Sequence, residues 1–142
     1  MSSDKVREHQ ILNELYVQAC SALLAAYGLT ANVQEQGGGT STRNSAILMS
    51  FLGAVGEGIH LSSMLKIDRD LVISMHPLGS ANISQVDLDD WCLEINNQLV
   101  GRVKNKLLGY RRVLSVGLPL LLTGTPWSDS SPSLSLVSFL GI

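Results

Sequence analysis

The sequence predicts an α+β fold in which helices cover one face of a largely antiparallel sheet. Three observations predict this fold class. Apolar residues recur at helical spacing in two long stretches, 4–28 and 86–108. Short apolar runs bounded by glycine or proline lie between these stretches and after them. The resulting order of helix, hairpin, short helix, long helix and strands is typical of a sheet with helices on one side.

The length and composition predict one globular domain spanning residues 1–142. A chain of this size can bury a core without help from a metal or a disulfide. Apolar residues make up 45% of the chain, which argues against intrinsic disorder. No segment recurs as a second copy.

The first helix is expected over residues 4–28, with Gly28 as its C-terminal cap. Its predicted apolar stripe consists of Ile11, Leu12, Leu15, Tyr16, Ala19, Leu23 and Ala26. A polar connection, 29–44, follows and contains three consecutive glycines. No Gly-Lys-Ser/Thr follows these glycines, so we interpret them as a flexible loop and not as a phosphate-binding loop.

Two strands are expected at 45–52 and 58–64, joined by a turn over 53–57 that contains two glycines. A short helix over 69–75 follows, for which Asp68 is a candidate cap. Three further strand candidates lie at 113–116, 118–122 and 134–140. Pro119 has no backbone N–H to donate, so it belongs at the start of a strand, at an edge or at a bulge.

The long helix over 86–108 has a buried stripe and a contrasting polar stripe. Ser84 or Asp87 is expected to cap it, and Gly109 to end it. The predicted buried residues are Leu88, Trp91, Cys92, Ile95, Leu99 and Val103. At about 100° per residue, Asp90, Glu94, Asn97 and Gly101 fall within a stripe roughly 60° wide on the other side of the helix. Glu94 and Asn97, three residues apart, therefore present an acid and an amide side by side.

The charge and the apolar runs exclude several function classes. Ten basic and twelve acidic residues give a net charge of −2, which offers no electrostatic reason to expect a nucleic acid or an anionic membrane as partner. The longest apolar run, 113–122, is too short to span a bilayer. The basic residues near the end of the long helix suit the negative end of its dipole.

The cysteines and histidines predict neither a disulfide framework nor a metal site. Cys20 and Cys92 are far apart and lie among apolar helix residues, so we expect two buried free thiols and a cytoplasmic protein. The three histidines have no ligand spacing with each other or with a cysteine. We therefore expect no metal and no cofactor of the protein's own.

Residues 90–119 resemble the CheX and CheC-like family of chemotaxis phosphatases. The family's helix carries a Glu-x-x-Asn pair, here Glu94 and Asn97, with an acid or serine four residues earlier, here Asp90. A proline follows a little more than twenty residues later, here Pro119. Segments 50–53, 58–62 and 114–124 also look like the family. The pair occurs once in this chain, which is closer to CheX than to CheC.

The resemblance implies hydrolysis of the aspartyl phosphate on a response-regulator receiver domain. In that role Asn97 would orient the attacking water, and Glu94 would pair with the receiver's active-site lysine. Asp90 would extend the acidic docking edge, and Gly101 would let the partner's backbone approach. The Mg²⁺ would belong to the receiver and not to this chain.

Two other functions stay open at this point. The chain is alternatively a non-catalytic binding module that docks on a signalling protein, or a purely structural dimer of the same fold. A homodimer is expected on separate grounds, because an apolar final strand is an exposed edge that a second subunit can pair with.

Overall fold

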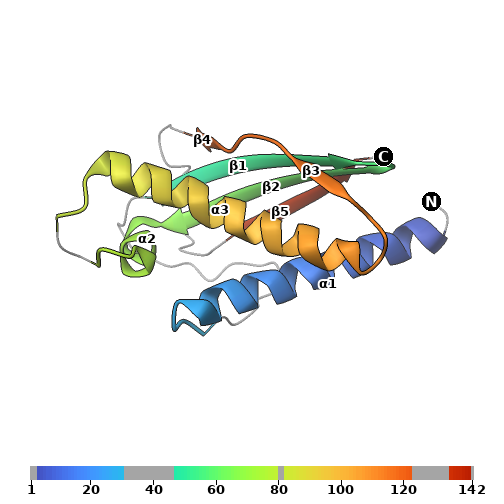
Figure 1. Ribbon diagram of the computed structural model, residues 1–142, viewed down its shortest axis with the longest axis horizontal. Helices are drawn as coiled ribbons and strands as arrows, with labels where there is room; N and C mark the ends of the chain where they lie inside the picture. The colour runs from blue at the N-terminus through green and yellow to red at the C-terminus, as the bar shows by residue number, and fades with distance from the viewer. Residues whose placement is uncertain (1–2, 31–46, 80–81, 123–134, 142) are drawn as a thin grey trace.

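The computed structural model describes residues 3–30, 47–79, 82–122 and 135–141. Its elements follow the predicted order, and Figure 1 shows them along the chain. They are α1 (Ser3–Ala26), β1 (Ile47–Gly56), β2 (Ile59–Asp68), α2 (Arg69–Met75), α3 (Gln85–Leu108), β3 (Leu114–Val116), β4 (Leu120–Leu122) and β5 (Ser135–Gly141). The expected glycine-rich loop lies in 31–46, outside the described residues.

Helix α1 ends as its sequence predicts. Gly28 adopts a left-handed φ of 75°, and the Leu29 N–H donates to the Leu24 carbonyl at 2.9 Å. This i to i−5 bond satisfies a carbonyl that the end of the helix would leave unpaired. The predicted stripe needs correction at its end, because Ala26 is exposed and Leu24 is buried instead.

The hairpin between β1 and β2 turns later than the sequence predicts. Its two turn residues are Glu57 and Gly58, and Gly58 has a φ of 70° that suits glycine. Gly53, expected in the turn, lies inside β1 opposite Ser62. Of the glycines in this hairpin, only Gly58 has a positive φ, so the chain reverses there. Both strands therefore extend closer to the turn and are longer than predicted.

The sheet has the order β3-β1-β2-β5, and β4 also pairs with β1. All four pairings are antiparallel. Strands β3 and β4 lie along the same edge of β1, with Gly117 N–H donating to the Gly53 carbonyl at 2.8 Å between them. Pro119 directly precedes β4, as its missing N–H predicts. At the other end of the order lies β5, so the predicted pairing of this strand with a second subunit stays a prediction.

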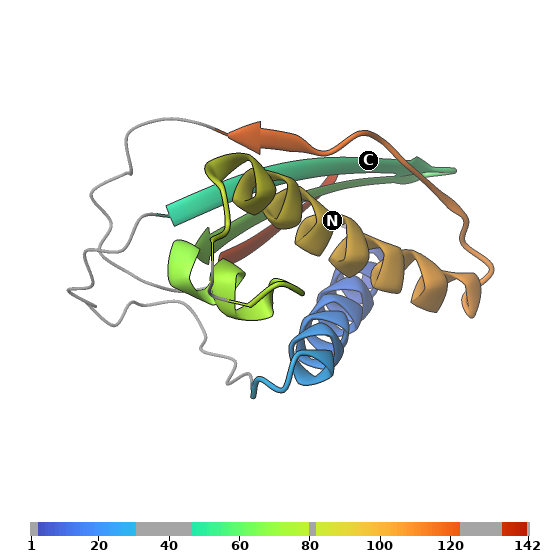
Figure 2. The same ribbon diagram turned by 60° about the vertical axis from the view of Figure 1, so that its left-hand side comes forward.

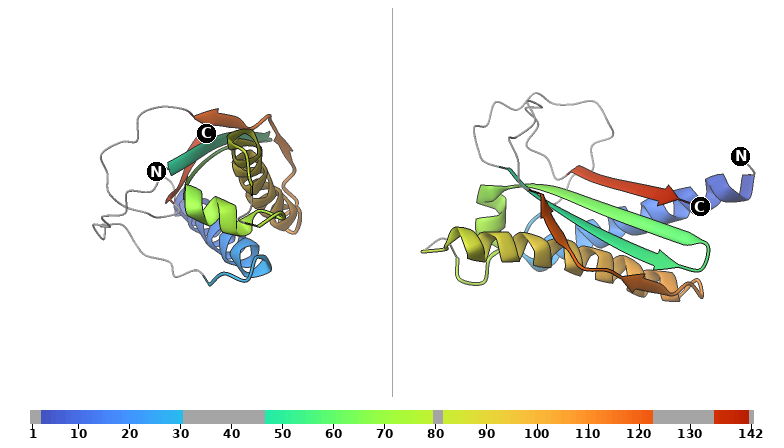
Figure 3. Two further views of the ribbon diagram at one scale, coloured as in Figure 1. Left: turned by 90° about the vertical axis from the view of Figure 1, so that its left-hand side faces the viewer. Right: turned by 90° about the horizontal axis from the view of Figure 1, so that it is seen from above.

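The three helices of the described residues lie on one face of the sheet, which confirms the predicted fold class. Figure 2 and the left view of Figure 3 show the sheet above the helices, and the right view of Figure 3, seen from above, shows the sheet in front of α3. Alternate residues of the two central strands, β1 and β2, point into the core between the sheet and the helices. The buried ones are Ser50, Leu52, Ala54, Leu61, Ser63, Leu65 and Ile67. This period of two is the signature of a sheet covered on one side.

The predicted short helix is confirmed, and so are the two buried cysteines. Helix α2 has the predicted bounds, and Asp68 occupies its N-cap position, although its side chain makes no capping hydrogen bond. The two cysteines are buried free thiols, as predicted. Within the described residues, no helix combines the length and the apolar character needed to cross a membrane.

Candidate functional site

Helix α3 carries the predicted site, and a side-chain cap fixes where it begins. The Ser84 hydroxyl oxygen accepts a hydrogen bond from the Asp87 N–H at 3.1 Å and its O–H donates to the Asp87 carboxylate at 2.8 Å. Asp87 also lies in the first turn, where the helix dipole favours a negative charge. The two residues that the sequence offered as alternative caps thus act together.

The inner face of α3 packs on β1 and β2. The side chains of Leu88, Cys92, Ile95, Leu99 and Val103 are all buried, as predicted. Trp91 is only half-buried and lies at the rim of this face, where its ring meets Tyr27 and His76 edge-on, with centroids 6.1 and 5.4 Å away. The prediction that Trp91 belongs to the core is therefore wrong in part, because its ring closes the gap between α1, α2 and α3.

One polar residue is buried in this apolar face. Asn96 is fully buried, and its amide nitrogen donates to the backbone carbonyls of Ser50 and Ser63, both at 3.2 Å. Its amide oxygen accepts from the Ser63 hydroxyl at 2.8 Å. The Ser50 hydroxyl adds a bond to the Cys92 carbonyl at 3.4 Å. Asn96 thus joins α3 to both central strands through hydrogen bonds, which are directional, whereas apolar packing is not.

This inner anchorage determines which side chains α3 presents to solvent. Asp90 and Asn97 are exposed, whereas Glu94 and Gly101 are half-buried. All four predicted site residues therefore lie on the outer side of the helix, clear of the sheet. Asn97 makes no hydrogen bond to any residue that the structure describes, so both ends of its amide are available to another molecule.

Glu94 is held more firmly than a solvated surface acid. Its carboxylate accepts a hydrogen bond from the Gln98 side-chain amide at 3.1 Å. The Gln98 carbonyl oxygen in turn accepts from the Tyr27 hydroxyl at 2.9 Å. Tyr27 follows the last turn of α1, so the end of the first helix reaches the middle of the third.

Charge is segregated along α3. Asp87, Asp89, Asp90 and Glu94 lie in its first half, and Arg102, Lys104 and Lys106 lie in its second half. Asp87 in the first turn and Lys106 in the last turn lie where the helix dipole favours their charges. Glu94 therefore lies in the acidic half and Asn97 directly follows that half, which suits a cationic group on a partner.

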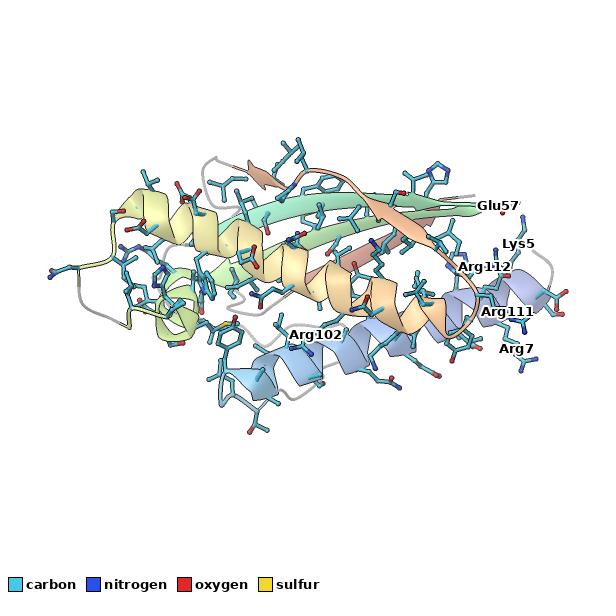
Figure 4. The ribbon with its side chains drawn as sticks, in the orientation of Figure 1. Lys5, Arg7, Glu57, Arg102, Arg111 and Arg112 are labelled. Carbon is cyan, nitrogen blue, oxygen red and sulfur yellow. The ribbon has the colours of Figure 1, made fainter. Side chains whose placement is uncertain are left out.

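A separate cluster of cations lies beyond the end of α3. Figure 4 shows Arg111 and Arg112 near Lys5 and Arg7 at the start of α1, whereas Arg102 lies farther back along the helix. Arg112 donates to the Glu57 carbonyl at 3.3 Å and pairs with Glu8 at 3.4 Å. A cavity of about 540 Å³ opens here, lined by residues 55–57, 110–113 and 115. None of the four predicted site residues lines this cavity.

The buried thiols have no chemistry to offer at neutral pH. Burial raises the pKa of Cys92 to about 11, and burial likewise raises the pKa of Cys20 to about 11. Both stay protonated at neutral pH and are poor nucleophiles or ligands. Across the part of the chain that the structure describes, no group of three or more His, Cys, Asp or Glu side chains is placed to hold a metal.

Sequence reasoning missed three residues that shape this site. Asn96 is adjacent to Asn97, but only the apolar residues around it on a helical wheel indicate that it faces inward. Gln98 stands four residues after Glu94, a spacing at which helical side chains meet. Tyr27 has no local signal, because its partner Gln98 is 71 residues away.

No protein-family model and no curated protein matches the sequence. Solved structures do match the fold. CheX from Vibrio vulnificus superposes with a TM-score of 0.64 at 16% identity, over 80% of this chain and 74% of that one. A CheC-like superfamily protein from Shewanella sp. PV-4 also gives a TM-score of 0.64, at 12% identity, over 100% of this chain and 92% of that one.

A third similar structure includes a partner. It is the CheX–CheY–BeF₃–Mg²⁺ complex from Borrelia burgdorferi, which matches with a TM-score of 0.57 at 16% identity over 91% of this chain and 88% of that one. Identities this low establish the fold alone. The chain therefore has the fold of CheX and CheC-like chemotaxis proteins, with helices on one face of an antiparallel sheet.

Proposed function

We propose that this chain hydrolyses the aspartyl phosphate of a response-regulator receiver domain by inserting the outer face of α3 into the receiver's active site. One observation carries the proposal: Asn97 is exposed on a capped, anchored helix, one turn from the half-buried carboxylate of Glu94. The shared fold supports the proposal, since one protein with this fold has been solved together with CheY, BeF₃ and Mg²⁺.

The chemistry needs little equipment from the hydrolase. An acyl phosphate is already activated, so its hydrolysis depends mainly on positioning the water and stabilising charge. The Asn97 amide can accept a hydrogen bond from the water and donate another to it. Fixing the water in line with the phosphorus–oxygen bond converts a disordered encounter into a near-attack geometry.

Glu94 would dock the helix. One of its oxygens accepts from Gln98, and the carboxylate retains further acceptor sites for the receiver's lysine. Asp90, one turn earlier and exposed, extends the same acidic edge. The Mg²⁺ of the receiver would neutralise charge on the phosphoryl group, so this chain needs no metal of its own.

Gly101 would let the receiver's backbone come close to the helix. Among the described residues, and apart from the adjoining backbone of α3 itself, a Cβ on Gly101 would meet no atom within 4 Å, so no tertiary contact there requires glycine. Close approach by the partner's backbone would explain a glycine at this position.

Receiver domains of signalling proteins are phosphorylated in the cytoplasm, which is the location that the proposal implies.

The decisive experiment follows the decay of a phosphorylated receiver in the presence of Mg²⁺. Substoichiometric wild-type protein should shorten the phosphate's lifetime, and Asn97→Ala should abolish the effect, at a cost of about a hundredfold or more in rate. Asn13→Ala is the matched control, because Asn13 is an exposed asparagine on α1. It should behave as the wild type.

The same experiment separates the alternatives. A wild-type protein that binds receivers without shortening the lifetime, and whose binding depends on Glu94 but not on Asn97, is the non-catalytic binding module. A protein whose partner interactions respond to neither substitution is the structural dimer. Either result would contradict the proposed hydrolysis.

A further inference from the structure

Three side chains from two helices form a continuous hydrogen-bonded series, which we name the Tyr27 relay. The Tyr27 hydroxyl donates to the Gln98 amide oxygen at 2.9 Å, and the Gln98 amide nitrogen donates to the Glu94 carboxylate at 3.1 Å. All three side chains are half-buried, so water competes with these bonds less than on an open surface. The relay ends on the acid that the proposed function uses for docking.

The direction of the relay is determined by its last member, the Glu94 carboxylate, which can only accept hydrogen bonds, whereas the Tyr27 hydroxyl can donate or accept. The carboxylate therefore turns the donor end of the Gln98 amide toward itself. The acceptor end then faces Tyr27, the first member, and accepts its proton. A Gln98 amide with the opposite orientation would set its NH₂ group against the Tyr27 hydroxyl and its oxygen against a carboxylate, which repel each other.

The first member is itself fixed by packing. The Tyr27 ring meets the Trp91 ring edge-on at a centroid distance of 6.1 Å. Tyr27 also lies within the turn that Gly28 and Leu29 close at the end of α1. The hydroxyl is therefore presented by a rigid backbone, and it connects α1 to the outer side of α3.

We propose that Tyr27 and Gln98 are positioning residues that hold Glu94 ready for the cation of its partner. This inference rests on the proposed function and adds two residues to it. Holding one carboxylate oxygen restricts the rotamers of Glu94 before the partner arrives, so less side-chain freedom is lost on docking. Neither residue touches the water that Asn97 orients.

The inference predicts a specific kinetic pattern. Loss of the relay should raise KM for the phosphorylated receiver and leave kcat unchanged, because docking by Glu94 contributes equally to the ground state and the transition state. Asn97→Ala should do the reverse and lower kcat. A hydrogen bond of ordinary net strength corresponds to a rise in KM of about three- to tenfold.

The test uses Tyr27→Phe, Gln98→Met and the double variant. Tyr27→Phe retains the ring and its contact with Trp91 and removes only the hydroxyl. Because Tyr27 acts through Gln98, the double variant should have the KM of Gln98→Met alone, giving a coupled double-mutant cycle. Tyr110→Phe is the matched control, since Tyr110 is exposed beyond the end of α3 and should leave KM unchanged.

A solution measurement accompanies the kinetics. The side-chain amide protons of Gln98 should shift in NMR spectra of Tyr27→Phe, and the Asn97 side-chain amide should not. An active wild-type protein whose KM is unaffected by either single substitution, or a double variant whose effects simply add, would overturn the relay and leave the proposed function standing. A wild-type protein that neither binds nor dephosphorylates any receiver would overturn both.

Discussion

Asn96 and Asn97 are identical neighbours with opposite surroundings. Asn96 is fully buried and uses both ends of its amide, on the backbones of Ser50 and Ser63 and on the Ser63 hydroxyl. Asn97 points about 100° away around the helix and is exposed. Since a buried amide must be fully paired, the first residue serves the fold. The second is exposed, as the proposed function requires of it.

The comparison extends to the two faces of α3. The inner face combines apolar packing with the Asn96 bonds, which determine the rotation and the height of the helix over the sheet. The outer face has an acidic half with Asp90 and Glu94, and none of the four predicted site residues is fully buried. The proposed catalysis would depend on this inner face to aim the outer amide, because catalytic positioning tolerates little error.

The largest change in stability is expected from a substitution on the inner face of α3. Asn96→Ala would remove a side-chain donor from each of two strand carbonyls and the acceptor of the buried Ser63 hydroxyl, and we expect it to lower the free energy of unfolding by about 3 kcal/mol. Asn97→Ala should change the same quantity by no more than about 0.5 kcal/mol. Urea unfolding of the two variants measures both values. Equal losses would contradict the distinction between the two asparagines.

A smaller change in stability is expected from a substitution on the outer face of α3. Gly101→Ala should raise the free energy of unfolding by about 0.5–1 kcal/mol, because alanine is the better helix former and the added methyl would meet no described residue outside the adjoining backbone of α3. The same substitution should weaken docking of a receiver. Thermal unfolding and receiver titration check the two parts, and a variant that is more stable and docks normally would remove Gly101 from the docking surface.

Much of the fold could be predicted because local signals agree with it. Gly28 ends α1, Ser84 begins α3, and the apolar stripe of α3 has the helical period over its whole length. The hairpin was misplaced because several glycines compete for its turn. Only the structure distinguishes Gly58, which needs a positive φ, from Gly56, where a Cβ would collide with the Val113 carbonyl.

The candidate site was predictable only in its local part. Asp90, Glu94, Asn97 and Gly101 share a stripe because helical geometry relates positions three and four residues apart. The partners of Asn96 are on strands 46 and 33 residues away, and Tyr27 is on another helix. Such pairings depend on tertiary packing, which one sequence does not encode in any local pattern.

We propose the outer face of α3 as the surface on which a receiver domain docks, and the two asparagine side chains offer a direct test. A receiver carrying Mg²⁺ and BeF₃⁻ is titrated into the isotopically labelled protein, and both side-chain amide resonances are followed by NMR. The account predicts that the Asn97 resonance shifts with saturation while the Asn96 resonance stays in place. Binding that leaves the Asn97 resonance unmoved would contradict the account.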